Sequence, residues 1–564
     1  LEKVMNPLLD TSALPRFGDI SSEHAVPAIR ELISAHRQKL VELLEKNERP
    51  TFDGLVPALE DMNHELSRVW SPIGHLHSVL GDAGWREAYN ECLAAITEHH
   101  TELSQNTELQ QAFQAIAANL DSDAPAAWRK VVEYALRDFR LAGVSLADDK
   151  KSEFRKTRQK LAAAQAQFEQ NVQDSTDAWH RSVEEASQLA GLPAQIVERA
   201  LADAEAAEES GWRLNLDFPT YQAVMTHADD RGLRHEFYRA WSTRASVLGP
   251  KPDWDNATTI EDIMSLRHKL ATLVGFGGYA EYSLATKMAG TTTEVLEFLR
   301  ELAARAREAA TAEMSALGEL AGEPLMAWDL SYYLEKLKQS KYAISDDILR
   351  QYFPAARVVE GMFGLARKLY QVSVQRIDEV SGWHDTVAYY EVRDAENRPI
   401  GGFYADLYAR SGKRSGAWID ECIVRKNMSG EATLPVGYLV CNFSPPDKNG
   451  VSLLTHNDVV TLFHEFGHML HHLLTRVDYP SIAGINGVPW DAVELPSQFM
   501  ENFAWSYDVL SEASGHVETG EALPRELFDK LNDSRYCGAA LAMLRQLEFA
   551  LYDFRMHADY DPAP

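Results

Sequence analysis

The first part of the chain shows an apolar pattern with helical spacing. Within residues 26–44, apolar side chains recur three, four and seven positions apart, at Ile29, Leu32, Ile33, Leu40 and Leu43. This is the spacing of one face of an amphipathic helix. No strand-like alternation interrupts residues 20–145. The pattern therefore predicts a succession of helices, each burying one side.

Helical spacing continues to about residue 320. Residues 150–172 form a long polar segment in which Phe154, Leu161 and Phe168 are seven positions apart. Such a stripe is suited to packing against another helix of the same chain. Coiled-coil dimerisation is the minor alternative, because so few heptads are present. Residues 293–320 predict another long helix.

The pattern changes after residue 387. Residues 388–393 and 401–407 are short aromatic and β-branched runs separated by D-A-E-N-R-P, which predicts a β-hairpin. Residues 436–443 predict a further strand, closed by S-P-P-D. A small sheet is therefore expected shortly before the next helix.

Residues 459–474 are apolar almost all round a helix, which indicates that the helix is buried. The run nevertheless contains His464, Glu465 and His468 in an H-E-x-x-H arrangement. Positions four apart lie one turn above each other, so both imidazoles can bind one cation with Glu465 beside them. A catalytic zinc takes three protein ligands and a water, and an adjacent carboxylate can accept the proton of that water. Glu465 is the candidate base.

An accidental H-E-x-x-H arises in on the order of one chain in twenty at this histidine content. The buried frame strengthens the metal interpretation, because buried polar groups need partners and a metal serves all three. His471 and His472 cannot complete the site, since His472 lies roughly 12 Å from His464 along the helix axis. The metzincin pattern also fails, because its later positions hold His471 and Leu474 here.

The candidate third ligand is Glu494, which lies near the start of a predicted helix at residues 491–502. A loop rich in glycine and proline separates this helix from the first one, so Glu494 can face back toward the histidines. An ordinary solvated glutamate has about equal weight on the residues alone. Gln498 and Glu501 are one and two turns further on, and they could orient the metal-bound histidines.

Bulk properties narrow the class of protein. The chain has 564 residues and a formal charge of -29, which argues against nucleic acid as a partner. The charge also agrees with an acidic cleft that favours cationic peptides, although plain solubility is the preferred explanation. Four scattered cysteines without a C-x-x-C pair indicate neither a disulfide framework nor a thiolate metal site.

No signal for a membrane, a nucleotide or a serine hydrolase is found in the sequence. No apolar stretch reaches about 18 residues, and the start of the chain lacks the basic and apolar regions of a signal peptide. We therefore expect a cytoplasmic protein. Because the chain begins with Leu1, residues 1–4 before Met5 are interpreted as additions to the natural sequence. Glycine-rich phosphate motifs and a G-x-S-x-G elbow are also lacking.

H-E-F-G-H followed by V-E-L-P-S-Q-F-M-E-N-F resembles the thimet oligopeptidase (M3) family of zinc peptidases, and most closely its bacterial oligopeptidase A branch. The resemblance covers essentially the whole chain. Further matching stretches lie at residues 238–246, 267–289, 328–333, 402–408 and 546–554.

The resemblance implies a mostly helical, two-lobed, zincin-type metallopeptidase with a small sheet beside the active-site helix and a deep substrate channel. Its lobes would be built from discontinuous segments. We divide the chain into an N-terminal helical region, 1–200, and an M3-type catalytic region, 201–564. The implied ligands of one Zn2+ per chain are His464, His468 and Glu494.

The expected function is zinc-dependent endopeptidase activity on short intracellular peptides, including cleaved signal peptides. We expect a monomer without nucleic-acid or membrane partners. One rival is a non-catalytic peptide-binding protein that keeps the fold, although an intact Glu465 argues against it. Another is a zinc hydrolase that acts on other substrates.

Four further positions are candidates for peptide binding. An extended peptide can pair with a sheet edge, and we assign that edge to residues 436–443, including Gly437 and Tyr438. An ordinary core strand is the alternative at even odds. Gly484 and Gly487 could belong to a flexible loop that covers the substrate, with a plain connector as the alternative.

The family pattern continues for more than a hundred residues beyond the segment that matches residues 547–557, and it includes a histidine and a run rich in glycine and tyrosine. This chain stops at Pro564. We therefore expect a fragment that binds zinc but turns over peptides poorly, because donors to the developing oxyanion would be lacking. Residues 539–554 should then expose apolar surface.

Overall fold

The computed structural model describes residues 6–11, 13–428, 430 and 432–562. Within these residues the chain is mostly helical, with one five-stranded and one two-stranded sheet. This confirms the expected fold class. The first part contains five helices and no strand, as its periodicity predicts: α1 (Ser22–Lys46), α2 (Phe52–Leu80), α3 (Ala83–Ser104), α4 (Thr107–Asn119) and α5 (Ala126–Leu141).

The middle part is also helical, apart from a pair of short antiparallel strands, β1 (His180–Val183) and β2 (Trp212–Asn215). Its helices are α6 (Asp148–Asp177), α7 (Ala194–Ala206), α8 (Phe218–His227), α9 (Arg231–Ser242), α10 (Ala257–Leu273), α11 (Tyr279–Leu284), α12 (Thr292–Ala321), α13 (Leu330–Tyr342), α14 (Asp346–Arg350) and α15 (Ala355–Tyr370).

The seven-residue stripe of α6 is used within the chain. Phe154 and Leu161 are buried in a cluster with Ile263 and Leu270 of α10, and α6 also contacts α3. These contacts bury the apolar side of a helix whose other positions are mostly polar. Packing inside one chain therefore accounts for the stripe, as preferred over coiled-coil dimerisation.

The main sheet has the order β3-β4-β5-β7-β6. The predicted hairpin is confirmed as β4 and β5, and the strand at residues 436–443 is confirmed as β7. β5 and β7 are parallel, and the other neighbours are antiparallel. The strands are β3 (Ser373–Arg376), β4 (Ala388–Arg393), β5 (Pro399–Tyr408), β6 (Trp418–Ile423) and β7 (Val436–Phe443).

Both faces of the sheet are covered. Phe403 and Leu439 belong to a core shared with α15 and with the next helix, α16 (His456–Leu473), whereas Tyr404 and Tyr438 point to the opposite face, against α1, α2 and α3. Burial on both faces explains why β7 reads as a continuous apolar run rather than an alternating one.

The assignment of residues 436–443 to the sheet edge is wrong. β7 is hydrogen-bonded on both sides, to β5 and to β6, so its backbone has no free side for a peptide. The Tyr438 side chain is fully buried. Gly437 faces α16, because a Cβ there would lie 2.6 Å from Met469 Sδ. The edge beside α16 is β6, and the core-strand alternative holds for β7.

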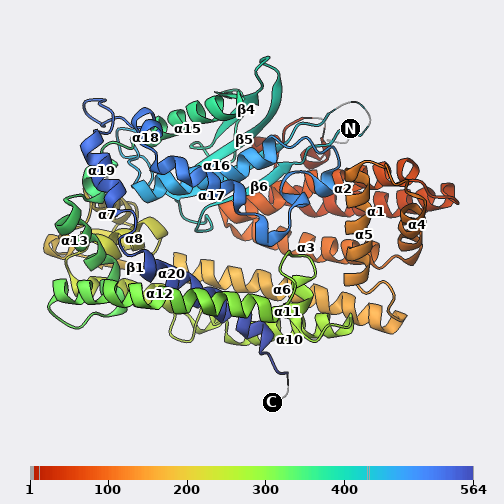
Figure 1. Cartoon of the computed structure of the whole chain (residues 1–564), viewed down its shortest axis with the longest axis horizontal. Helices are drawn as coiled ribbons and strands as arrows, with labels where there is room; N and C mark the ends of the chain where they lie inside the picture. Colours follow the sequence, from red (N-terminus) through yellow and green to blue (C-terminus); the bar gives the residue numbers. More distant parts are fainter. Residues whose placement is uncertain (1–5, 12, 429, 431, 563–564) are drawn as a thin grey trace.

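The last part of the chain is helical again, with α17 (Leu495–Glu501), α18 (Tyr507–Ala513), α19 (Arg525–Ser534) and α20 (Ala539–Ala558). Figure 1 shows α16 and α17 in the middle of the molecule, with the long helices α12, α20 and α6 below them. α20 packs along α12, and its Phe549 and Tyr552 are exposed, as expected for residues 539–554. Within the described residues, every helix is too short or too polar to cross a bilayer.

Candidate metal centre

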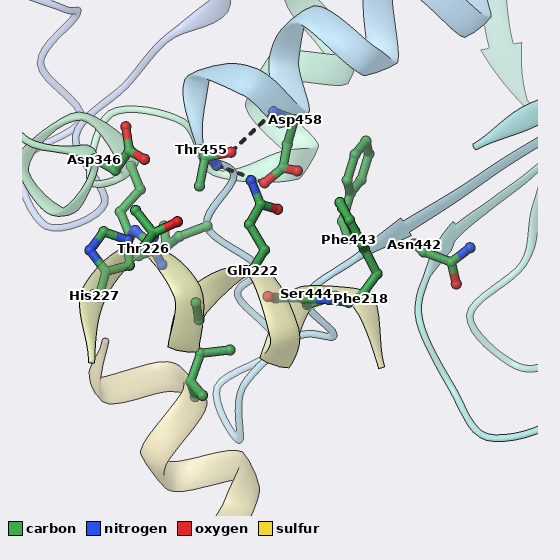
Figure 2. Close-up of a pocket in the computed structure, with 15 residues that line it drawn as sticks. Phe218, Gln222, Thr226, His227, Asp346, Asn442, Phe443, Ser444, Thr455 and Asp458 are labelled. Atoms are coloured by element: carbon green, nitrogen blue, oxygen red, sulfur yellow. Dashed lines mark hydrogen bonds between the residues drawn. The ribbon is translucent and has the colours of Figure 1, made fainter. Parts of the chain in front are cut away.

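The helix α16 begins at a complete capping box. Thr455 Oγ1 accepts from the Asp458 N–H at 3.1 Å, and Asp458 Oδ2 accepts from the Thr455 N–H at 2.9 Å (Figure 2). Two backbone donors that a helix start leaves unpaired are thereby satisfied. The helix is then buried against β5, β7 and α15, with Leu462, Phe463 and Phe466 in the core. Its polar side chains are therefore held on a rigid element.

Figure 2 shows a small cleft at this end of α16, where Thr226 and His227 of α8 face Asp346 and the capping box. Thr455 precedes His464 by nine residues, or roughly 13 Å of helix. The cleft therefore lies away from the H-E-x-x-H residues, which do not line it.

The structure brings His464, His468 and Glu494 together. The Nε2 atoms of His464 and His468 lie 3.1 and 3.0 Å from the same oxygen, Glu494 Oε2. The candidate ligand atoms of the three residues lie within 4.8 Å of one another, and in the described part of the chain no other such group of three was found. A tetrahedral cation needs ligand atoms that converge in this way.

Glu494 does not lie inside the helix expected at residues 491–502. That helix is shorter: α17 begins at Leu495, and Glu494 is its N-cap residue. A separate 3₁₀ turn, η8 (Trp490–Ala492), precedes it. Pro496 lies in the first turn of α17, where its missing N–H is tolerated, whereas deeper in a longer helix it would break the backbone ladder.

Gln498 and Glu501, the two candidates on α17 for orienting the histidines, differ in their contacts. Glu501 Oε1 lies 2.7 Å from His464 Nδ1. The Gln498 side chain is exposed and makes no hydrogen bond to either histidine within the described residues. Only Glu501 is therefore placed to fix the orientation of an imidazole in the cluster.

The donor set fits a cation. In the neutral tautomer, the N–H at His464 Nδ1 donates to Glu501, so the Nε2 lone pair faces the carboxylate of Glu494. A lone pair and a carboxylate oxygen repel each other at about 3 Å unless a positive charge lies between them. Burial lowers the pKa of His468, which favours the neutral form that binds metals.

Glu465 is buried beside this cluster. Burial raises its pKa to about 7; His464 opposes the shift and Glu494 adds to it. A carboxyl with a pKa near neutrality can both accept and donate a proton, as a general base and acid must. Desolvation is the dominant cause.

His472 is not brought to the cluster, as its distance along the helix predicts. Its Nε2 lies 3.1 Å from the Val436 carbonyl oxygen, so it anchors α16 to β7. His472 Nδ1 also lies 3.5 Å from Glu421 Oε1 of the edge strand β6. The loop after α16 reaches the same carboxylate, since Asn486 Nδ2 donates to Glu421 at 3.0 and 3.1 Å.

The two loop glycines have structural roles in this arrangement. Gly484 has a φ of 56°, and a Cβ there would lie 3.3 Å from His472 Cα. A Cβ at Gly487 would lie 2.3 Å from the Ile482 carbonyl oxygen. Both belong to a tight 3₁₀ turn, η7 (Gly484–Gly487). This packing favours the connector interpretation over a flexible cover.

Sequence reasoning missed β6. Residues 418–423, W-I-D-E-C-I, are short and carry two acidic residues, so the run gave a weak strand signal. The β-branched and aromatic residues in this run were the only features that favoured a strand. The hydrogen bonds that join Asp491 to the backbone of Met288 and Ala289 also had no signal in the sequence.

Comparison with known proteins places the chain in a family. The profile of peptidase family M3 matches residues 224–564, and the N-terminal domain of neurolysin and thimet oligopeptidase matches residues 29–151. The chain is 43% identical over 564 residues to oligopeptidase A of Haemophilus influenzae, covering 99% of this chain and 83% of that protein. Oligopeptidase A of Escherichia coli is also 43% identical, over 568 residues and with the same coverage.

Solved structures agree on the fold. A Bacillus anthracis protein whose crystal structure is described as that of an oligoendopeptidase F superposes with a TM-score of 0.59 at 15% identity, covering 95% of this chain and 79% of that one. At this identity the likeness concerns the fold alone. Together with the matched profile and the relatives above, the geometry of α16 and α17 shows that the chain belongs to peptidase family M3.

Proposed function

We propose that this metallopeptidase is a zinc-dependent endopeptidase that hydrolyses short peptides, with His464, His468 and Glu494 as ligands of one zinc ion. The observation that carries the proposal is the convergence of these three side chains beside a buried Glu465. The M3 family implies a metal, and two imidazoles with one carboxylate are a set that zinc accepts in catalytic sites.

The residues of the chain divide the chemistry between them. A bound zinc ion polarises the scissile carbonyl and lowers the pKa of the attacking water. Glu465 accepts the proton of that water as its oxygen bonds to the carbonyl carbon. The same carboxyl then donates the proton to the amide nitrogen as the C–N bond breaks. Glu501 holds the His464 ring in the tautomer whose Nε2 faces the ion.

The substrate backbone is proposed to lie along β6 instead of β7. β6 lies at the sheet edge and contacts α16. One of its carbonyls, that of Glu421, already accepts from Ser71 Oγ at 2.6 Å. Residues 418–420 come before Glu421 in β6 and pair with residues 438–440 of β7. Those partners lie further along β7 than Val436, the residue that His472 contacts at the C-terminal end of α16. We assign backbone pairing with the peptide to this stretch.

The substrates are proposed to be peptides up to roughly twenty residues, since an extended segment must reach a recessed edge and a folded protein cannot present one. Cleaved signal peptides belong to this class. The relatives named above are oligopeptidases by name, which supports this size class. A monomer acting in the cytoplasm and a deep channel around the site complete the proposal.

A single experiment tests the size limit and the metal together. One cleavable sequence is offered as a free peptide and as a strand inside a stable folded domain, to the metal-stripped protein and after zinc is added back. Zinc should restore cleavage of the free peptide only. Equal cleavage of both forms would contradict the size limit. Binding of the peptide without cleavage under any metal would favour a non-catalytic peptide-binding protein.

A further inference from the structure

The turn that leads into Glu494 is tied to a distant segment of the chain. Both carboxylate oxygens of Asp491, in η8, accept from the Met288 N–H at 2.9 Å, and Oδ2 also accepts from the Ala289 N–H at 2.9 Å. Met288 and Ala289 lie between α11 and α12. The contact therefore joins residues about two hundred positions apart. Asp491 lies three residues before Glu494, the proposed third ligand.

The α11–α12 turn is shaped by its own hydrogen bonds. Lys287 Nζ donates to Ser283 at 2.8 and 2.9 Å, and Glu294 Oε2 accepts from the Gly290 N–H at 3.1 Å. The amides of Met288 and Ala289 are therefore presented by a turn that is fixed on both sides. Partial desolvation raises the pKa of the Asp491 carboxyl, but the hydrogen bonds from these amides lower it further, so that the pKa lies below its usual range.

The segment around Glu494 is held unevenly. After it, α17 is anchored by the buried Ser497 and Met500, and Ser497 Oγ donates to Glu494 Oε2 at 2.9 Å. Before it, Val493 is buried, whereas Trp490 is 68% exposed and Asp491 is also exposed. The Glu494 side chain itself is half exposed. Its backbone position therefore depends on the burial of Val493 and also on what fixes the exposed turn at residues 490–491.

We infer that Asp491 is a positioning residue for the metal centre: it holds the Glu494 turn against the α11–α12 turn, so that the third ligand is placed by two separate parts of the fold. The inference rests on the proposed role of Glu494. α12 packs with α13 and α20, whereas the histidines are on α16. A shift between these groups of helices would consequently act on Glu494 through Asp491.

The test measures zinc affinity of the metal-stripped protein by competition with a chromophoric chelator. Asp491→Ala should weaken zinc binding roughly 10- to 100-fold, the usual effect of losing a residue that orients a ligand. Asp491→Asn, which keeps the shape but offers one acceptor oxygen, should fall between Asp491→Ala and the wild type. The thermal midpoint of each metal-free variant is recorded so that a folding defect is recognised.

Asp447→Ala is the matched control, because Asp447 also accepts from two backbone amides in a surface turn, those of Asn449 and Val451. It should leave zinc affinity unchanged. If Glu494→Ala loses zinc while both Asp491 variants bind it as the wild type does, the inference is overturned and the proposed ligand set stands. If Glu494→Ala also binds zinc normally, both are refuted.

Discussion

A Cβ atom on Gly467 would lie 2.6 Å from the carbonyl oxygen of Pro496 and 2.7 Å from Ser497 Cα. Glycine inside the H-E-x-x-H segment therefore lets α16 and α17 cross in backbone contact. This crossing sets the distance between the two histidines on one helix and Glu494 at the start of the other.

Gly467→Ala should consequently push α17 away from α16 and weaken zinc binding at least about tenfold. It should also cost about 1–3 kcal/mol of unfolding free energy, since the added methyl group overpacks a filled contact. Zinc competition and urea unfolding measure the two effects. Gly318→Ala in α12 is the control, because apart from the adjacent backbone of its own helix no atom lies within 4 Å of its added Cβ. Unchanged zinc affinity in Gly467→Ala would contradict the role of the crossing.

Glu465→Gln should retain zinc and lose peptide turnover by several orders of magnitude, because the variant keeps the shape of the site and removes the proton acceptor. His464→Ala should lose zinc and turnover together. Metal content and cleavage of a fluorogenic peptide are measured on the same preparations. A Glu465→Gln protein with near-normal turnover would refute its assignment as the base.

Glu501→Ala and Gln498→Ala compare a residue that contacts His464 with a neighbour on the same helix that does not. Glu501 lies 2.7 Å from His464 Nδ1, so its loss should lower zinc affinity roughly 10- to 100-fold. Gln498 is exposed on the same short helix, and its loss should leave zinc affinity nearly unchanged. The two affinities are compared by the same competition assay, and equal losses would show that the Glu501 contact is not what matters.

Acid should destabilise the metal-free protein through its buried histidines. Burial lowers the pKa of His75 to about 3 and that of His456 to about 4, whereas both titrate near 6.5 when unfolded. Below pH 6.5 the unfolded chain binds protons that the folded chain does not. The free energy of unfolding therefore decreases as the pH is lowered from about 6.5 to 4, by up to about 1.4 kcal/mol per pH unit for each histidine.

His75→Phe tests this prediction at one site. His75 stacks on Tyr438 at 3.8 Å between ring centroids, and neither of its ring nitrogens has a hydrogen-bond partner within the described residues. A phenyl ring suits these apolar surroundings and does not titrate. Urea unfolding at a series of pH values should give a shallower slope between pH 6 and 4, and an unaltered slope would disprove the contribution of His75.

The sequence by itself determined many of the elements and the two histidines at the core of the metal centre. The all-round apolar pattern of α16 indicated burial, and H-E-x-x-H placed two imidazoles on one face, because positions four apart meet within a single helix whatever surrounds it. Helical spacing likewise predicted the five N-terminal helices, and short aromatic and β-branched runs bounded by turn residues predicted β4, β5 and β7. These features depend only on residues close together in the sequence.

Tertiary structure decided the rest, because periodicity shows which side of an element is buried but not what buries it. Gln498 and Glu501 share a helix face in the sequence, and only the crossing of α17 over α16 brings Glu501 to His464. The sequence assigned the sheet edge to β7, whereas the edge strand is β6, because strand order is set by pairing between distant segments. Asp491 reached Met288 and Ala289 through backbone amides, which every residue except proline carries and no sequence pattern can mark.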